Sequence, residues 1–337
     1  MLSGHHNTNY VLHAGLLLAP VLRVTPFARF KYRVPLETVE VVPRIWPSEV
    51  DVLAVVCRHL REVPRGLALQ GGCSLHRYLR GKALSERNPD GQVGYRLLRE
   101  FAAFFVRTAQ VPAEELPACP EDWPAEGDSQ KFLHWLVDFT ENRVHLPNRD
   151  RFGDLFDAVG IPLGAMTVFK ENHRALTCRP FVLLHTDVHR ANVVLHRKGI
   201  SVIDWEFAIY GDPLHDLSTH LVRMRYDDDE QEWMIGLWAE AMKEAGLGSL
   251  TVGLHEDLGT YLDFEYAQSV FPDVMRAALD LPADAGEQHF RVAGDRVGRA
   301  MHRARKPLKL DLVPDSEQIV EALRKWHSAD SSSAPWA

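Results

Sequence analysis

Three polar side chains in the middle of the chain have the residue types and spacing needed for chemistry at a metal ion. Asp187 and Asn192 are five residues apart, and Asp204 follows after a short apolar stretch. Carboxylate and amide oxygens are hard ligands that suit Mg²⁺, which takes its remaining ligands from water and phosphates. A further carboxylate beside such an ion can orient or deprotonate a nucleophile.

The sequence around these residues predicts a β-hairpin that positions them. Val193–Leu195 and Ile200–Ile203 are short apolar strands, and residues 196–199 form the turn between them. Asn192 directly precedes the first strand and Asp204 directly follows the second. Because antiparallel neighbours lie about 5 Å apart, these two ligands are expected to meet at the open end of the hairpin. Asp187, in the loop that feeds the hairpin, can face the metal site without binding the metal.

The order of these residues resembles a known catalytic motif. His185-x-Asp187-x-x-x-x-Asn192 resembles the catalytic loop of kinase-fold phosphotransferases, and Asp204-Trp205-Glu206 stands where protein kinases have Asp-Phe-Gly. The resemblance implies that Asp187 is the catalytic base and that Asn192 and Asp204 hold Mg²⁺.

Two further features are similar to one branch of this group, the aminoglycoside phosphotransferase and choline kinase family. His189 replaces the usual lysine of protein kinases, and Gly-Asp-Pro-Leu-His-Asp-Leu follows at residues 211–217. The resemblance implies transfer of the γ-phosphoryl group of ATP or GTP to a hydroxyl of a small molecule. It also implies that three residues support the catalytic loop, namely His185, His189 and Asp216.

Three alternatives compete with this interpretation. His185, Asp187 and His189 could form a Zn²⁺ site of a metallohydrolase, although that leaves Asn192 and Asp204 unexplained. A protein kinase is disfavoured because no Ala-Pro-Glu follows Asp204. A catalytically weak, nucleotide-binding regulatory protein of the same fold is the third alternative.

The amino-terminal residues resemble the phosphate-binding loop of the family. Ser3, Gly4 and Asn7 match its Ser-Gly-Gly-x-x-Asn pattern with one glycine missing, and backbone N–H groups in such loops can bind phosphate oxygens. The strand that normally precedes the loop is reduced to Met1 and Leu2, so we expect a truncated first strand.

Glu49 begins a Glu-x-x-Val-Leu helix that resembles the family's helix, whose glutamate orients a phosphate-binding lysine. A strand predicted at Glu40–Ile45 places Arg44 where that lysine is expected. An arginine keeps the charge and can bind phosphate through two N–H groups, so Arg44 is predicted to replace the lysine. An ordinary surface pair of Arg44 and Glu49 is the simpler interpretation, and Lys31 is a second candidate for the phosphate contact.

Tyr78-Leu79-Arg80-Gly81 matches the family's strand and hinge between two lobes. By that resemblance the backbone of Tyr78 and Leu79 contacts the adenine ring. A plain strand and turn would have the same hydrophobicity.

The elements that must position these residues predict an α+β, two-lobed, protein-kinase-like fold. Short β-branched and aromatic stretches with one helix indicate a small β-rich nucleotide lobe over residues 1–84. Apolar residues at helical spacing dominate a catalytic and substrate-binding lobe over residues 85–327. The small and polar residues 328–337 are expected to form a disordered tail.

Composition limits the partners of the protein. With 38 basic and 46 acidic residues, the net charge of −8 disfavours nucleic acid as a partner. The 4 cysteines have no paired spacing, which indicates a reduced, cytoplasmic protein. No segment resembles a membrane span or a signal peptide. The expected partners are therefore a nucleoside triphosphate and a small hydroxylated acceptor.

Overall fold

The computed structural model describes residues 2–3, 7–21, 24–36, 40–61, 63–69, 72–197 and 199–333. The chain divides into two compact units. The first unit comprises Met1–Val39, Arg44–Ser129 and Thr177–Leu254, and the second comprises Glu40–Pro43, Gln130–Leu176 and His255–Ala337. All residues predicted to take part in chemistry belong to the first unit.

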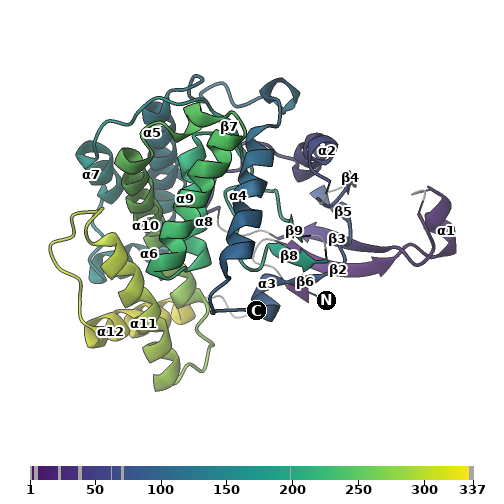
Figure 1. The fold of residues 1–337 in the computed structure, drawn as a ribbon. Coiled ribbons are helices and arrows are strands. Elements are labelled where there is room, and N and C mark those ends of the chain that lie inside the picture. Colours follow the sequence, from purple (N-terminus) through teal and green to yellow (C-terminus); the bar gives the residue numbers. More distant parts are fainter. Residues whose placement is uncertain are drawn as a thin grey trace. The chain divides into compact units, whose positions relative to one another are not determined.

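A small antiparallel sheet forms the amino-terminal part of the first unit, in the order β1-β2-β3-β5-β4 (Figure 1). Its strands are β1 (Leu2–Ser3), β2 (Asn7–His13), β3 (Arg29–Pro35), β4 (Gly66–Ala68) and β5 (Ser74–Arg77). The first strand is present as the two residues of β1, which places Leu2 opposite Asn9. The register places Lys31 of β3 opposite His76 of β5. Strands β2 and β3 fall where β-branched and aromatic stretches predict them, and β4 and β5 overlap the two further short strands expected near Gly66–Leu69 and Leu75–Leu79.

Helix α2 (Glu49–His59) is the one helix predicted for this part of the chain, and the structure confirms it. The Ser48 hydroxyl accepts the N–H of Asp51 at 3.3 Å and so caps the helix. A Cβ atom at Gly66 of β4 would lie 3.3 Å from the side chain of Leu53, so glycine allows α2 to pack closely against the sheet. The helix begins at Glu49, directly after its capping residue Ser48. The buried residues of the helix are Val52, Leu53, Val55 and Val56.

The strand predicted at Glu40–Ile45 is wrong. Residues 40–48 form bends and irregular structure. Pro43 and Pro47 have no backbone N–H to contribute to a sheet. The apolar residues Ile45 and Trp46 are buried in a loop instead. Arg44 therefore does not stand at the end of a strand.

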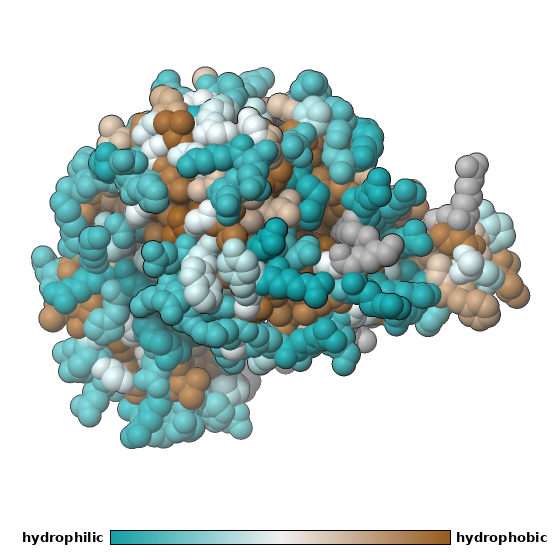
Figure 2. All heavy atoms as spheres, in the orientation of Figure 1, coloured by the Kyte–Doolittle hydropathy of each residue, from teal (hydrophilic) through white to brown (hydrophobic). Residues whose placement is uncertain are grey.

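Helix α1 (Gly15–Val21), between β2 and β3, was not predicted. Ala14, Ala19 and Phe30 form a small buried cluster beneath it. Its outward side chains Leu16 and Leu17 are exposed, and apolar surface gathers at this end of the β2–β3 ribbon (Figure 2). The helix is a short local element that lies outside the sheet.

The predicted hairpin is confirmed. Strands β8 (Val193–His196) and β9 (Gly199–Val202) pair with Val193 opposite Val202, and β6 (Lys82–Ala83) joins the other side of β8. A second pair consists of β7 (Val182–Leu184) and β10 (Ile209–Gly211). The loop from β7 to β8 contains Asp187, and the loop from β9 to β10 contains Asp204.

Helices complete the first unit. They are α3 (Leu84–Arg87), α4 (Tyr95–Ala109), α8 (Pro213–Met224) and α9 (Asp228–Glu244), with 3-10 turns at Ala113–Glu115 and Gly248–Thr251. Asp212 caps α8 by accepting the N–H of Leu214 at 2.9 Å, and its carboxylate also binds the fully buried Arg179 at 2.6 Å. This buried ion pair fixes the start of α8.

The regular elements of the second unit, among the residues that the structure describes, are all helical. Its elements are α5 (Ser129–Phe139), a π-helical turn (Thr140–His145), α6 (Leu146–Ala158), α7 (Ala165–Asn172), α10 (Leu254–Leu279), α11 (Glu287–Ala304) and α12 (Ser316–Ser333). The tail predicted from residue 328 is wrong in its first part, because α12 continues to Ser333. Residues 334–337 lie outside the described residues. A small antiparallel sheet followed by a mostly helical remainder confirms the predicted fold class, and the lobe boundary at residue 84 stays a prediction.

Candidate active site

The loop that contains Asp187 is fixed from below by helix α8. The backbone N–H groups of His185 and Thr186 donate to the two carboxylate oxygens of Asp216, at 2.9 and 2.8 Å. Thr186 has a φ of 59°, which is a left-handed conformation that a β-branched residue rarely adopts. The structure thus places Asp216 where the predicted loop support is needed.

Asp187 is buried and held on both carboxylate oxygens. The side-chain amide of Asn192 donates to Oδ2 at 2.8 Å, and Arg223 of α8 binds Oδ1. The Nε2 atom of His189 lies 3.5 Å from Oδ1. Burial by itself would raise the pKa of Asp187, but Arg223 and His189 hold it well below its usual value. Asp187 is therefore a carboxylate at neutral pH.

The hairpin brings Asn192 and Asp204 together at its open end, as predicted. The backbone oxygen of Asn192 accepts the N–H of Ile203 at 2.9 Å, one residue before Asp204. Asp204 has a φ of 75°, and such strain in a non-glycine residue is typical of functional sites. Since the Nδ2 atom of Asn192 is bound to Asp187, its Oδ1 atom is the one that remains to bind a cation. An amide oxygen and a carboxylate at one strand end fit Mg²⁺.

Arg33 is the residue that the sequence interpretation missed. It lies on β3 with only 4% of its side chain exposed. Its guanidinium binds Oε2 of Glu49 at 2.5 Å and Oδ1 of Asp204 at 2.6 Å, and it lies 3.5 Å from Oε1 of Glu206. Burial alone would raise the pKa of Asp204, but Arg33 and Lys31 keep it below its usual value. Glu49 also accepts the backbone N–H of Trp205 at 2.9 Å.

Arg44 does not pair with Glu49. Its guanidinium binds Glu206 at 2.9 Å and lies 5.1 Å from the ring centre of Phe207. The arginine that pairs with Glu49 is Arg33 and not Arg44. Lys31 stands two residues before Arg33 on the same face of β3, where burial and Arg33 lower its pKa.

His185 supports the loop and does not face solvent. Its Nδ1 accepts the N–H of Asp187 at 3.2 Å, and its ring lies 4.6 Å from that of Trp205. Burial lowers the pKa of His185 to about 4, so it is neutral near pH 7. Among the described residues, no group of three or more His, Cys, Asp or Glu side chains could hold a metal ion.

The nucleotide-binding residues predicted near the amino terminus are placed only in part. Ser3 and Asn7 lie in β1 and β2, and Gly4 lies outside the described residues. Tyr78 and Leu79 lie between β5 and β6, where the N–H of Tyr78 donates to the Arg29 oxygen at 3.0 Å. Their contacts with a nucleotide stay predictions.

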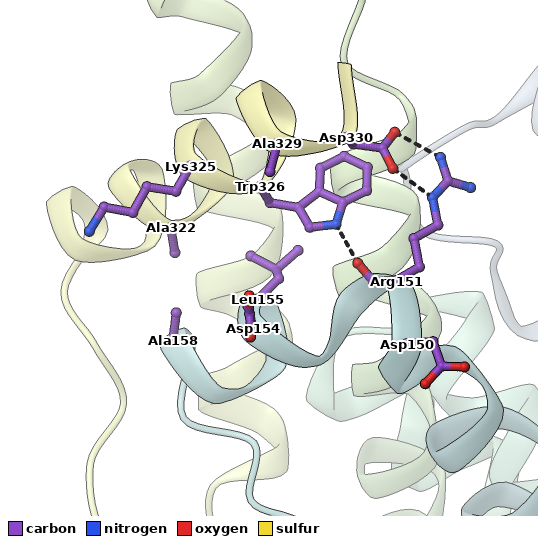
Figure 3. A pocket seen from close by; sticks show the side chains of 10 residues that line it. All are labelled: Asp150, Arg151, Asp154, Leu155, Ala158, Ala322, Lys325, Trp326, Ala329 and Asp330. Atoms are coloured by element: carbon purple, nitrogen blue, oxygen red, sulfur yellow. Dashed lines mark hydrogen bonds and ion pairs between the residues drawn. The ribbon is translucent and has the colours of Figure 1, made fainter. Parts of the chain in front are cut away.

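A separate hollow of about 640 Å³ lies between α6 and α12 in the second unit (Figure 3). Trp326 forms one wall and donates its indole N–H to the Arg151 oxygen, while Arg151 binds Asp330 at the rim. None of the predicted site residues lines it. No helix among the described residues is long and apolar enough to cross a membrane.

Three features together define a kinase-like fold. They are the small sheet with Arg33 on one strand, Glu49 at the start of helix α2, and the hairpin that follows the loop with His185 and Asp187. The sequence matches the Phosphotransferase enzyme family over residues 3–250, and the chain belongs to this family. A stretch of 83 residues is 34% identical to thiamine kinase of Escherichia coli (strain SMS-3-5 / SECEC). That match covers 24% of this chain and 30% of the thiamine kinase, so it spans less than a third of that relative.

Solved structures show the same fold. Choline kinase from Cryptosporidium parvum Iowa II is similar with a TM-score of 0.53 and 11% identity, over 97% of this chain and 92% of that one. A thermostable mutant of aminoglycoside phosphotransferase APH(4)-Ia, in a ternary complex with AMP-PNP and hygromycin B, gives a TM-score of 0.50 and 14% identity, over 92% of each chain. At these identities the likeness establishes the fold alone.

Proposed function

We propose that the protein transfers the γ-phosphoryl group of ATP or GTP to a hydroxyl group of a small molecule. The observation that carries this proposal is the arrangement of Asp187, Asn192 and Asp204 around the open end of one hairpin. The relatives are named for thiamine, choline and aminoglycosides, which are small molecules with hydroxyl groups. Membership in a phosphotransferase family supports the reaction class.

In this proposal Asp187 orients the acceptor hydroxyl and accepts its proton. The residue is ionised and buried, and Asn192 fixes one of its oxygens, so its position is set before the acceptor binds. Asn192 and Asp204 would hold Mg²⁺, which neutralises charge on the phosphates when bound. His185, His189 and Asp216 keep the loop in place.

Arg33 takes the phosphate-binding role that the family assigns to a strand lysine. Its guanidinium presents separate N–H groups to Glu49 and Asp204. An arginine fork can bind phosphate oxygens through two N–H groups, whereas Glu49 continues to fix its orientation. Arg44, which is bound to Glu206 at the edge of this cluster, has the lesser role.

The experiment is a screen of hydroxylated metabolites and antibiotics with labelled ATP and GTP, with products detected by mass. Asp187→Asn is expected to leave Mg·ATP affinity nearly intact and to lower kcat by roughly 10²–10⁴-fold. Asp204→Ala is expected to weaken Mg²⁺-dependent nucleotide binding, and Asp228→Asn, at an exposed carboxylate, is the matched control.

Retained turnover in both Asp187→Asn and Asp204→Ala would refute the phosphotransferase proposal. Nucleotide binding without any product across the screen, and without hydrolysis stimulated by a metabolite pool, would favour the regulatory alternative. Equal loss of nucleotide affinity in both variants would contradict the division of roles.

A further inference from the structure

Three residues on one face of helix α8 contact the catalytic loop. Asp216, His220 and Arg223 are four and three positions apart, which places them on the same side of the helix. Asp216 binds the backbone N–H groups at the start of the loop, and the Nδ1 atom of His220 lies 2.9 Å from the Val188 oxygen. Arg223, at the end of the row, reaches the carboxylate of Asp187 itself.

Arg223 differs from the other two residues in burial. The side chains of Asp216 and His220 are 3% and 0% exposed, whereas 30% of the Arg223 side chain is exposed. A residue that only braces the loop has no need of solvent access. Arg223 therefore combines contact with the Asp187 carboxylate and access to solvent.

The division of contacts on Asp187 shows where a substrate can meet it. Oδ2 is bound by the buried Asn192 amide at 2.8 Å, and Oδ1 is bound by Arg223, with His189 at 3.5 Å. The acceptor hydroxyl is therefore expected to approach Oδ1, beside the guanidinium. One N–H of Arg223 binds Oδ1, and the planar fork of an arginine can bind a second anion at the same time.

Resting on the proposed function, we propose that Arg223 binds the phosphoryl group while it is transferred to the acceptor. In the transfer, a bond forms between the acceptor oxygen and the γ-phosphorus, and the bond from the γ-phosphorus to the β,γ-bridging oxygen breaks. The electron pair of that bond stays on the nucleoside diphosphate, and the hydroxyl proton passes to Asp187. Until that proton is transferred, the phosphoryl group lies close to the negative Asp187, and an arginine bound to both offsets their repulsion.

The chemistry of this role gives a specific signature in kinetics. A cation that acts on the group in transfer affects kcat, whereas one that binds the ground-state nucleotide affects KM. Arg223→Ala is expected to lower kcat by about 10²-fold or more, with KM for Mg·ATP changed less than about 3-fold. Arg223→Lys should recover part of the rate, because it keeps the charge and loses the fork.

Two measurements separate this role from loop support. Added guanidinium ion should raise the rate of Arg223→Ala and leave the wild-type rate unchanged. ADP with aluminium fluoride, which imitates the planar phosphoryl group, should inhibit Arg223→Ala at least 10-fold more weakly than wild type, while ADP alone binds both equally. Arg225→Asn is the matched control, because Arg225 is exposed, has a φ of 54° that asparagine tolerates, and lies on the same turn.

Each remaining outcome contradicts the proposal. Wild-type kcat in Arg223→Ala, equal weakening of ADP and ADP–aluminium fluoride, or an effect confined to KM for the acceptor would overturn it. If Arg223→Ala does not fold, Arg223→Lys decides, and full activity with unchanged aluminium fluoride inhibition in that variant would overturn the proposal. A wild-type protein without turnover would instead refute the proposed function itself.

Discussion

Replacing Arg33 should cost far more stability than replacing Arg44. Arg33 is 4% exposed, and its guanidinium lies 2.5, 2.6 and 3.5 Å from the carboxylates of Glu49, Asp204 and Glu206. Without it, these carboxylates face one another in a buried site. Removing one partner of a buried ion pair typically costs about 3–5 kcal/mol, and we expect that loss for Arg33→Ala. Arg44 is 36% exposed and binds Glu206 at 2.9 Å, so Arg44→Ala should cost below about 1 kcal/mol.

The loss should also depend on pH. Burial already raises the pKa of Glu49 to about 7, with Arg33 opposing that rise. Without Arg33 the native carboxylates bind protons more tightly still, while the unfolded chain is unchanged. The native state then gains protons relative to the unfolded state, so the destabilisation should be larger at pH 8 than at pH 6.

The assay is urea unfolding of both variants at pH 6 and pH 8, followed by tryptophan fluorescence and by hydrogen exchange of α2. Arg33→Lys should give an intermediate loss, because a lysine cannot bind Glu49 and Asp204 in the same fork geometry. A loss below about 1 kcal/mol for Arg33→Ala, or equal losses for Arg33→Ala and Arg44→Ala, would refute this reasoning.

Three further predictions concern residues of the first unit. Asp212→Ala should lower the free energy of unfolding by about 3–5 kcal/mol, because it leaves the fully buried Arg179 unpaired, and Asp212→Ala with Arg179→Met should recover part of that loss in urea. Gly81→Ala should destabilise the β6–β8 pairing by about 1–3 kcal/mol, since its Cβ would lie 2.5 Å from the Leu195 oxygen, and hydrogen exchange of β8 checks this. Below pH 6.5 the stability should fall by about 3 kcal/mol per pH unit near pH 5.5, because native histidines stay neutral while unfolded ones bind protons, and a flat profile in urea would contradict it. Burial lowers the pKa to about 3 in His76 and His215 and to about 4 in His185 and His220. Burial raises the pKa of Glu49 to about 7 and that of Asp216 to about 6, and these two carboxyl groups partly offset the effect of the histidines on stability.

Local patterns predicted the elements that position the hairpin. The short apolar stretches Val193–Leu195 and Ile200–Ile203 around a turn are a signal within about ten residues, and the hairpin formed as expected. The same holds for α2, where a capping serine and apolar spacing suffice. Helix α1 was missed because its seven residues contain Pro20 and are mostly exposed, so no amphipathic period marks them.

There is a physical reason why the sequence predicted Arg44, and not Arg33, as the cation beside Glu49. The prediction of Arg44 depended on a strand at Glu40–Ile45. The β-branched residues that suggested this strand are equally suited to a buried loop. Arg33 meets Asp204 across 171 positions of sequence, and only the register of β3 beside β2 and β5 places it there. A sequence pattern could have indicated Arg223, since the spacing of Asp216, His220 and Arg223 puts them on one helical face.

Asp187 and Asp204 are each bound by a different arginine. This explains which residues of the site could be predicted from the sequence. Asp187 and Asp204 belong to one hairpin, so their positions follow from a local motif. Their arginines come from α8 and β3, so tertiary packing decides their positions. A nucleotide with Mg²⁺ at Asp204 must share or replace the contact with Arg33, and an acceptor at Asp187 must do the same with Arg223. Arg33 and Arg223 therefore each offset the charge of one of these two carboxylates. Under the proposed function, nucleotide affinity should depend mainly on Arg33 and the rate mainly on Arg223.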